Sequence, residues 1–195
     1  MVALQAADLA GTSKMRLIAF IFAMLAASVP AGAQTWSDYE NPSEGFTAAF
    51  PGEPKVETTS YKAPGGQLVE ARVYSVVQES GAFKVTVAEI PHPETSAGNV
   101  LAYAVFMLSR KGELKLNLAH ATRRIVGRQA IIEGVDGSQT YASVFFHNGR
   151  LYQIEGTIPA GGATADAFRF QQSFDFPDGW RPPEGRSNEL RRDNP

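Results

Sequence analysis

The residues best suited to chemistry in this chain lie in one short stretch, residues 141–157. Within it, His147 and Arg150 flank the pair Asn148–Gly149, which readily adopts the two positive φ angles of a type I′ turn, so the stretch predicts a β-hairpin. The two-residue loop fixes the register and places His147 opposite Arg150. A cationic pair backed by the ring of Tyr152 could hold a carboxylate or a phosphate group. We therefore take His147, Arg150 and Tyr152 as candidate ligand-binding residues. The alternative is that polar side chains at this hairpin tip serve only solubility.

The same register makes both sides of the predicted hairpin apolar. The opposed pairs are Phe145 with Tyr152 and Ser143 with Ile154 on one side, and Phe146 with Leu151 on the other. A sheet with one side in water alternates cleanly between apolar and polar residues, so a hairpin that is apolar on both sides predicts cover on both sides. We expect an α/β (α+β) fold, with an antiparallel β-sheet and helices packed on both of its faces.

Other catalytic and metal-binding patterns are missing from the sequence. The three histidines, His92, His120 and His147, have no second ligand at metal-binding spacing, and there is no G-x-S-x-G, phosphate-loop or dinucleotide-binding motif. The chain has no cysteine, which excludes disulfides, thiolate metal sites and a cysteine nucleophile. We expect no metal, no cofactor and no catalytic residue. The sequence thus favours a non-catalytic protein over an enzyme.

The charge of the chain argues against nucleic-acid binding. Its 195 residues include 20 acidic and 18 basic side chains, for a net charge of −2. The body of the chain has no basic cluster, whereas clustered Lys and Arg dominate binding to a phosphate backbone. A content of 44% hydrophobic and 19% charged residues is that of an ordinary globular domain. We expect an unknown protein or small-molecule partner.

The start of the chain has the order of a secretory signal peptide. Lys14 and Arg16 precede the apolar run Leu17–Val29, and the small residues Ala31–Ala33 follow it. This run is shorter than the ~20 residues that cross a bilayer core. We therefore predict a leader of residues 1–33, no stable membrane anchor after cleavage, and a periplasmic or secreted mature chain.

The predicted domain organisation follows from this leader and from the composition of the other end. Residues 34–176 are expected to form one globular domain. Residues 177–195 hold many proline and charged residues with almost no apolar content, so they predict a disordered tail. Met1 and Met15 are alternative initiators.

Alternating apolar residues and turn residues predict further strands and two helices. We expect strands at residues 46–50, 54–59, 68–77 and 83–90, and one over 123–133 that is interrupted near Gly127. The polar lead-in of residues 35–44 predicts no strand, and residues 113–122 stay unassigned. A helix is expected from residue 96 to residue 111, with a buried stripe of Val100, Leu101, Ala104, Val105 and Leu108, and a shorter one at residues 163–170.

Three short motifs carry a family resemblance. They are Gly45-Phe46-x-x-x-Phe50-Pro51-Gly52-x-Pro54, the hairpin segment Gly149–Tyr152, and Arg169-Phe170-x-x-Ser173-Phe174. Together they resemble small exported proteins with a PsbP-like fold. The resemblance implies an antiparallel sheet with helices on both sides, and a non-catalytic accessory or binding role of the kind that most similar members have. No motif here matches the partner-binding or ion-related residues of the photosynthetic members, so none is carried over.

The sequence therefore leads to one main functional hypothesis and two alternatives. The main hypothesis is an exported soluble, non-catalytic binding or accessory module of unknown specific role. One alternative is a small hydrolase that uses His147 as a base near Arg150. The other is a carrier that holds a small apolar ligand between the sheet and the stripe at residues 100–108.

Overall fold

The computed structural model describes residues 35–90 and 96–177, so the predicted leader and all but the first residue of the predicted tail lie outside the described residues. The strands are β1 (Ser37–Asn41), β2 (Phe46–Phe50), β3 (Lys55–Lys62), β4 (Leu68–Gln78), β5 (Gly81–Glu89), β6 (Gly112–Thr122), β7 (Ile125–Gly134), β8 (Gln139–His147) and β9 (Arg150–Ile158). The helices are α2 (Ala97–Ser109) and α3 (Ala165–Ser173).

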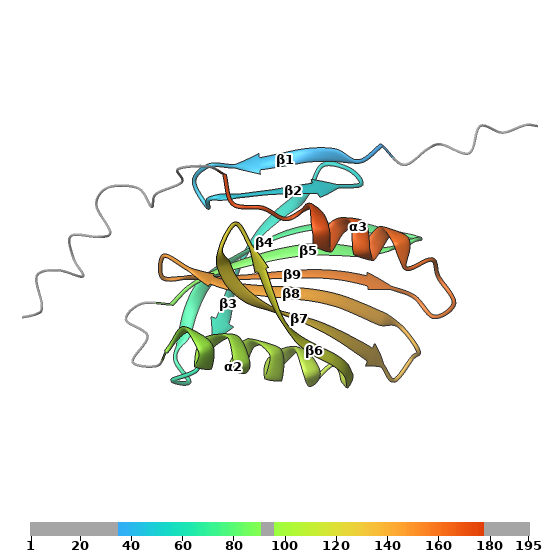
Figure 1. Cartoon of the computed structure of the whole chain (residues 1–195). Coiled ribbons are helices and arrows are strands. Elements are labelled where there is room, and N and C mark those ends of the chain that lie inside the picture. The colour runs from blue at the N-terminus through green and yellow to red at the C-terminus, as the bar shows by residue number, and fades with distance from the viewer. Residues whose placement is uncertain (1–34, 91–95, 178–195) are drawn as a thin grey trace, which may run out of the picture. The chain divides into compact units, whose positions relative to one another are not determined.

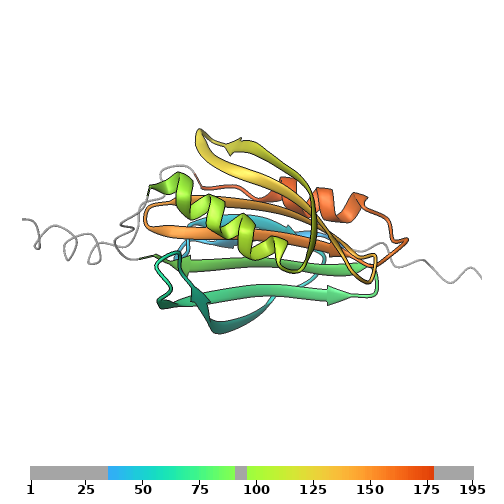
Figure 2. The same cartoon turned by 90° about the horizontal axis from the view of Figure 1, so that it is seen from below.

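In the described part of the chain, seven strands form one antiparallel sheet in the order β3-β4-β5-β9-β8-β7-β6 (Figures 1 and 2). Strands β1 and β2 form a separate antiparallel pair. The predicted central hairpin is confirmed as β8 and β9, with His147 opposite Arg150 and Phe145 opposite Tyr152. Asn148 and Gly149 have φ angles of 50° and 75°, as the expected turn requires.

Alternation along the central strands divides the core into two clusters. On β9, Tyr152 and Ile154 belong to one cluster, which we call the aromatic cluster, together with Phe170 of α3. Leu151 belongs to the other, which we call the aliphatic cluster, together with Val100 of α2. Because successive side chains of a strand point to opposite faces, the sheet contributes buried groups from both faces. The expected antiparallel sheet is confirmed, and the described residues add two helices to it.

Helix α2 begins and packs as its sequence pattern predicts. The Ser96 hydroxyl accepts a hydrogen bond from the backbone N–H of Asn99 at 3.4 Å, which satisfies one of the donors at the start of the helix. The buried residues of the helix are Val100, Leu101, Ala104, Val105 and Leu108. They pack against sheet residues in the aliphatic cluster, including Ala142 and Val144. The helix side chains therefore fill the space in which the carrier hypothesis would place a ligand.

Helix α3 and the segment after it close the aromatic cluster. Phe170, Phe174 and Phe176 are all buried there beside rings from β2, β5, β8 and β9. The segment is fixed to β2 because the backbone groups of Thr47 and Asp175 exchange hydrogen bonds of 2.9 and 3.0 Å. Residues 174–177 thus form an extended segment rather than a strand, and we call this segment the clasp.

Two details differ from the sequence predictions, and β4 has buried residues on both faces. The polar lead-in contains strand β1, which is stabilised by its pairing with β2 rather than by an apolar pattern of its own. The unassigned residues 113–122 form most of β6, and the irregularity expected near Gly127 lies instead in β6, between Leu114 and Leu116. On β4 both faces are used, since Ala71 is buried in the aliphatic cluster and Tyr74 in the aromatic one.

Candidate functional site

Arg150, the first residue of β9, is held by the turn that joins β1 to β2. It is only 5% exposed. Its Nη1 donates to the carbonyl oxygen of Ser43 at 2.9 Å and lies 3.3 Å from Oε2 of Glu44. Its Nη2 lies 3.4 Å from Oε1 of Glu89 on β5. The candidate cation of the hairpin is thus placed at a junction of three elements rather than extended into solvent.

Glu44 is the anionic partner that organises this junction. The residue is 5% exposed, and its Oε1 accepts from Nη1 of Arg72 at 2.6 Å while its Oε2 faces Arg150. One buried carboxylate therefore lies between two guanidinium groups. We call Glu44, Arg72 and Arg150 together the Glu44 clamp. The charge of Glu44 raises the pKa of Arg72, so the guanidinium stays charged at every ordinary pH.

Local turn chemistry fixes Glu44 in this position. The side-chain oxygen of Asn41 accepts hydrogen bonds from the backbone N–H of Glu44 at 3.0 Å and from the hydroxyl of Ser43 at 2.8 Å. Gly45 has a φ of 74°, a left-handed angle that glycine adopts without strain, and its N–H donates to the carbonyl of Asn41. Asn41 also donates to the hydroxyl of Tyr74 at 3.0 Å, which joins the turn to β4. The sequence Asn-Pro-Ser-Glu-Gly thus builds a rigid turn.

Tyr152 holds the β1–β2 turn through a hydrogen bond to its backbone. It is completely buried, and its hydroxyl donates to the backbone carbonyl of Glu44 at 2.7 Å. Its ring packs edge-on against Phe176 at 5.0 Å. Burial raises the pKa of Tyr152 well above its usual range, so the phenol remains a hydrogen-bond donor. Tyr152 therefore fixes the backbone of Glu44, the central residue of the Glu44 clamp.

His147 lies at the tip of the hairpin, apart from the clamp. Its Nε2 is 3.0 Å from the side-chain nitrogen of Asn148, which can only donate, so Nε2 accepts. Its ring packs against Phe176 at 5.4 Å. Burial lowers the pKa of His147, so the imidazole is neutral at pH 7. Of the three residues predicted from the hairpin, Arg150 and Tyr152 meet at Glu44, whereas His147 does not contribute a cation.

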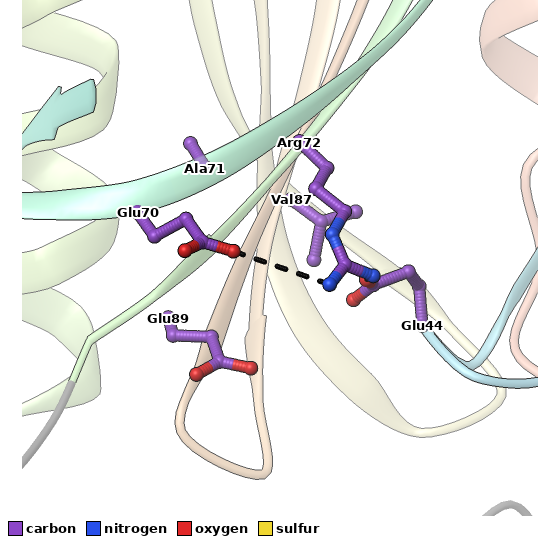
Figure 3. A pocket seen from close by; sticks show the side chains of 6 residues that line it. All are labelled: Glu44, Glu70, Ala71, Arg72, Val87 and Glu89. Atoms are coloured by element: carbon purple, nitrogen blue, oxygen red, sulfur yellow. Dashed lines mark hydrogen bonds and ion pairs between the residues drawn. The ribbon is translucent and has the colours of Figure 1, made fainter. Parts of the chain in front are cut away.

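A shallow recess of about 200 Å³, which includes open solvent, lies directly beside the clamp (Figure 3). Its lining residues are Glu44, Glu70, Ala71, Arg72, Val87 and Glu89. The Arg72 side chain is 41% exposed, and its Nη2 lies 4.0 Å from Oε1 of Glu70. Figure 3 shows the carboxylates of Glu70 and Glu89 one above the other, with the guanidinium of Arg72 between Glu70 and Glu44. This arrangement offers charged groups of both signs to a partner, and no serine, threonine or histidine lines it.

Within residues 35–90 and 96–177, no three histidine or carboxylate side chains are grouped in a way that could hold a metal ion. Over those residues, neither helix combines the length and the apolarity that a bilayer crossing needs.

Sequence reasoning missed Glu44 and Arg72, the two other members of the clamp. Glu44 belongs to the polar lead-in, and Arg72 is one of several charged residues of an alternating strand. The available signal was the turn sequence itself, because Asn41 followed by Pro42 and Gly45 predicts a tight turn that could present Glu44. No pattern of neighbouring residues in the sequence indicates that this turn contacts Arg72 on β4 or Arg150 on β9.

Comparison with known proteins supports the fold. The solution structure of cyanobacterial PsbP (CyanoP) from Synechocystis sp. matches with a TM-score of 0.51 and 18% sequence identity, covering 76% of this chain and 96% of that one. The PsbP-like fold predicted from the sequence motifs is therefore confirmed, and at this identity the likeness concerns the fold alone. No protein-family model matches the chain, and neither does any curated protein.

Proposed function

We propose that this chain is an exported, non-catalytic binding or accessory module, in which the surface around the Arg72 recess contacts a protein partner. The Glu44 clamp is the observation that carries this proposal. Arg72 and Arg150 both bind the Glu44 carboxylate, and the turn that presents Glu44 is itself held by Tyr152. The charged groups are therefore fixed in place before a partner arrives, which lowers the entropic cost of association.

The layered architecture supports such a role. In the proposed PsbP-like sandwich, α2 and α3 cover opposite faces of the sheet, as their separate membership of the aliphatic and aromatic clusters suggests. The recess lies at the junction of β4, β5 and the β1–β2 turn, and its walls come from strands rather than from a long loop. A site built on strands keeps its geometry, which suits recognition.

The proposal includes export of the chain. The order of Lys14, Arg16, the apolar run Leu17–Val29 and the small residues before Gln34 supports cleavage after Ala33. The mature protein would then comprise a domain of residues 34–176 and a tail of residues 177–195, in the periplasm or outside the cell. N-terminal sequencing of the protein from the exported fraction tests this part, and a chain that retains residues 1–33 would contradict it.

A photo-crosslinking amino acid at position 70 tests the binding surface. Glu70 lies at the rim of the recess, and its exposed position should tolerate the probe. The matched control is position 57 on β3, where Glu57 is also exposed but does not line the recess. We expect a discrete crosslinked partner from position 70 and none from position 57 in the exported fraction. Crosslinks of equal yield from both positions, or from neither, would count against the proposal.

A further inference from the structure

Strand β6 is one edge of the seven-stranded sheet, and Figure 2 shows it on the opposite side of the sheet from β3 and β4. Its inner side pairs with β7, and among the described residues no backbone group from outside the sheet bonds to it. The outward N–H and C=O groups of an edge strand can pair with a strand of another chain. At 11 residues, β6 is long enough for such pairing.

Only the first part of β6 has the features that protect an edge strand. Glu113 and Lys115 are charged there, and the register irregularity lies between Leu114 and Leu116. Charged side chains and bulges hinder the addition of another strand. The rest of the strand, residues 116–122, contains no Lys, Arg, Asp or Glu. We call residues 116–122 the open edge.

The side chains at the middle of the open edge are exposed on both faces of the sheet. Leu118 is 52% exposed, and its neighbours Asn117 and Ala119 are exposed as well. Successive side chains of a strand point to opposite faces, so neither face of the strand is covered at this point. Pairing with another strand would therefore cover both the backbone and an exposed leucine.

The other edge of the sheet is better protected. Strand β3 has a lysine at each end, Lys55 and Lys62, and Glu57 lies between them. These charges are spread along the strand, so another strand would have to accommodate them at several positions. The two edges are thus not equivalent, and the open edge of β6 is the one suited to pairing.

We propose that the open edge pairs in antiparallel fashion with the open edge of a second copy of this chain, about a two-fold axis at Leu118. Leu118 then faces its own counterpart, Asn117 faces Ala119, and Leu116 faces His120. In this register every opposed pair joins residues of the same face, and the two exposed leucines cover each other. The two sheets become one continuous sheet with the two-fold symmetry that is commonest among homodimers.

The charges at the two ends of β6 favour this occupant and this direction. Two carboxylates and one ammonium group lie at the start of the strand: Glu113, Glu133 and Lys115. Two guanidinium groups and one carboxylate lie at its end: Arg123, Arg124 and Asp175. The net charges are −1 and +1. Antiparallel pairing of two copies brings unlike ends together on both sides of the axis, whereas parallel pairing would bring like ends together.

A single engineered cysteine tests the register, because the chain has no cysteine of its own. Directly opposed residues have Cα atoms about 4.5–5.5 Å apart, a separation that a disulfide can span. Under mild oxidation, Leu118→Cys should give at least about tenfold more covalent dimer than Val126→Cys, since a paired thiol reacts at a high effective concentration. Val126 is 66% exposed but lies on β7, which is paired on both sides. Equal yields from the two variants would overturn the proposal.

Sedimentation of the protein without cysteine measures the association itself. One pair of strands is a small interface, so the dimer should form reversibly, and the average mass should rise toward that of two copies between about 10 μM and about 1 mM. A wild type that stays a single copy over this range would overturn the proposal and leave the open edge to a different protein.

A charge at the axis should prevent the association. Leu118→Lys places two ammonium groups opposite each other and should keep the mass of a single copy, while Val126→Lys should behave as the wild type does. Both positions are exposed, so neither change should lower the melting temperature appreciably. Association of Leu118→Lys equal to that of the wild type would contradict pairing at this edge. The open edge lies across the sheet from the Arg72 recess, so the result does not depend on that surface.

Discussion

The carboxylate of Glu44 lies 2.6 Å from Nη1 of Arg72, although the two residues belong to different sheets. Glu44 is in the turn of the β1–β2 pair, and Arg72 is on β4 of the seven-stranded sheet. Arg150 of β9 completes the contact from the other side. The ion pair between Glu44 and Arg72 joins the two sheets, and both residues line the recess.

Replacing Glu44 with glutamine should destabilise the protein. The substitution removes the more buried of the two carboxylates that face Arg150, and Glu89 remains. We expect a loss of about 2 kcal/mol in the free energy of unfolding, reduced from larger values because Arg72 is half-exposed. Denaturant unfolding measures it. Glu57→Gln is the control, because its pair with Lys55 is exposed and should contribute no more than about 0.5 kcal/mol. Similar losses in both variants would show that the Glu44 clamp stabilises the fold no more than an exposed ion pair does.

Removing the Tyr152 hydroxyl should weaken the same junction. In Tyr152→Phe the backbone carbonyl of Glu44 loses its donor while the buried ring is kept, so we expect a loss of about 1–2 kcal/mol. The loss should be smaller in a Glu44→Gln background than in the wild type, because both changes release the same turn. Strict additivity of the two losses would mean that hydroxyl and carboxylate act separately.

The clasp after α3 should be essential to stability. Phe174 is buried against Phe46, Phe145 and Tyr152, and Phe174→Ala should cost roughly 3–5 kcal/mol by leaving a cavity in the aromatic cluster. Val135→Ala, at a fully exposed turn position, is the control and should change stability by less than about 0.5 kcal/mol. A mild effect of Phe174→Ala would indicate that the clasp can detach while the sheet remains folded.

Acid should destabilise the protein through Glu155. The pKa of Glu155 is lowered in the folded state from its ordinary value of 4.5, so the unfolded chain binds its proton at a higher pH than the folded one. Glu155 forms ion pairs with Lys84 and Lys111. The stability that these pairs contribute is present above the unfolded pKa of Glu155 and is lost as the pH falls through its folded pKa. Unfolding of the wild type and of Glu155→Gln, followed from neutral pH downwards, should show a stability difference that shrinks below pH 4.5. A difference that stays constant with pH would contradict this assignment.

Local sequence signals were sufficient for the central hairpin and for α2. Asn148 and Gly149 specify one turn type. A two-residue turn fixes which residues of β8 and β9 face each other, beginning with His147 and Arg150. Ser96 and the apolar stripe of α2 likewise define the start and the buried face of the helix within a few residues. Both are cases in which the deciding interactions are close in sequence.

The parts that could not be predicted depend on distant contacts. Strand β1 is polar and exists because β2 pairs with it. The clamp joins Glu44 to Arg72 and Arg150, which are 28 and 106 positions away, and a single sequence contains no signal for such pairing. The hairpin register places Arg150 next to the tip, as predicted, but the sequence contains no sign that the β1–β2 turn covers it. The role of His147, Arg150 and Tyr152 in ligand binding stays a prediction.

The central claim, that the rim of the Arg72 recess contacts a partner, is tested most directly by charge reversal. The partner captured from position 70 is purified, and its affinity is measured for the wild type, for the double variant Glu70→Lys with Glu89→Lys, and for the control Glu57→Lys. We predict that the double variant binds at least about tenfold more weakly, as expected when like charges are brought together at an interface, while the control binds as the wild type does. Unchanged affinity in the double variant, with the fold intact by circular dichroism, would contradict the claim.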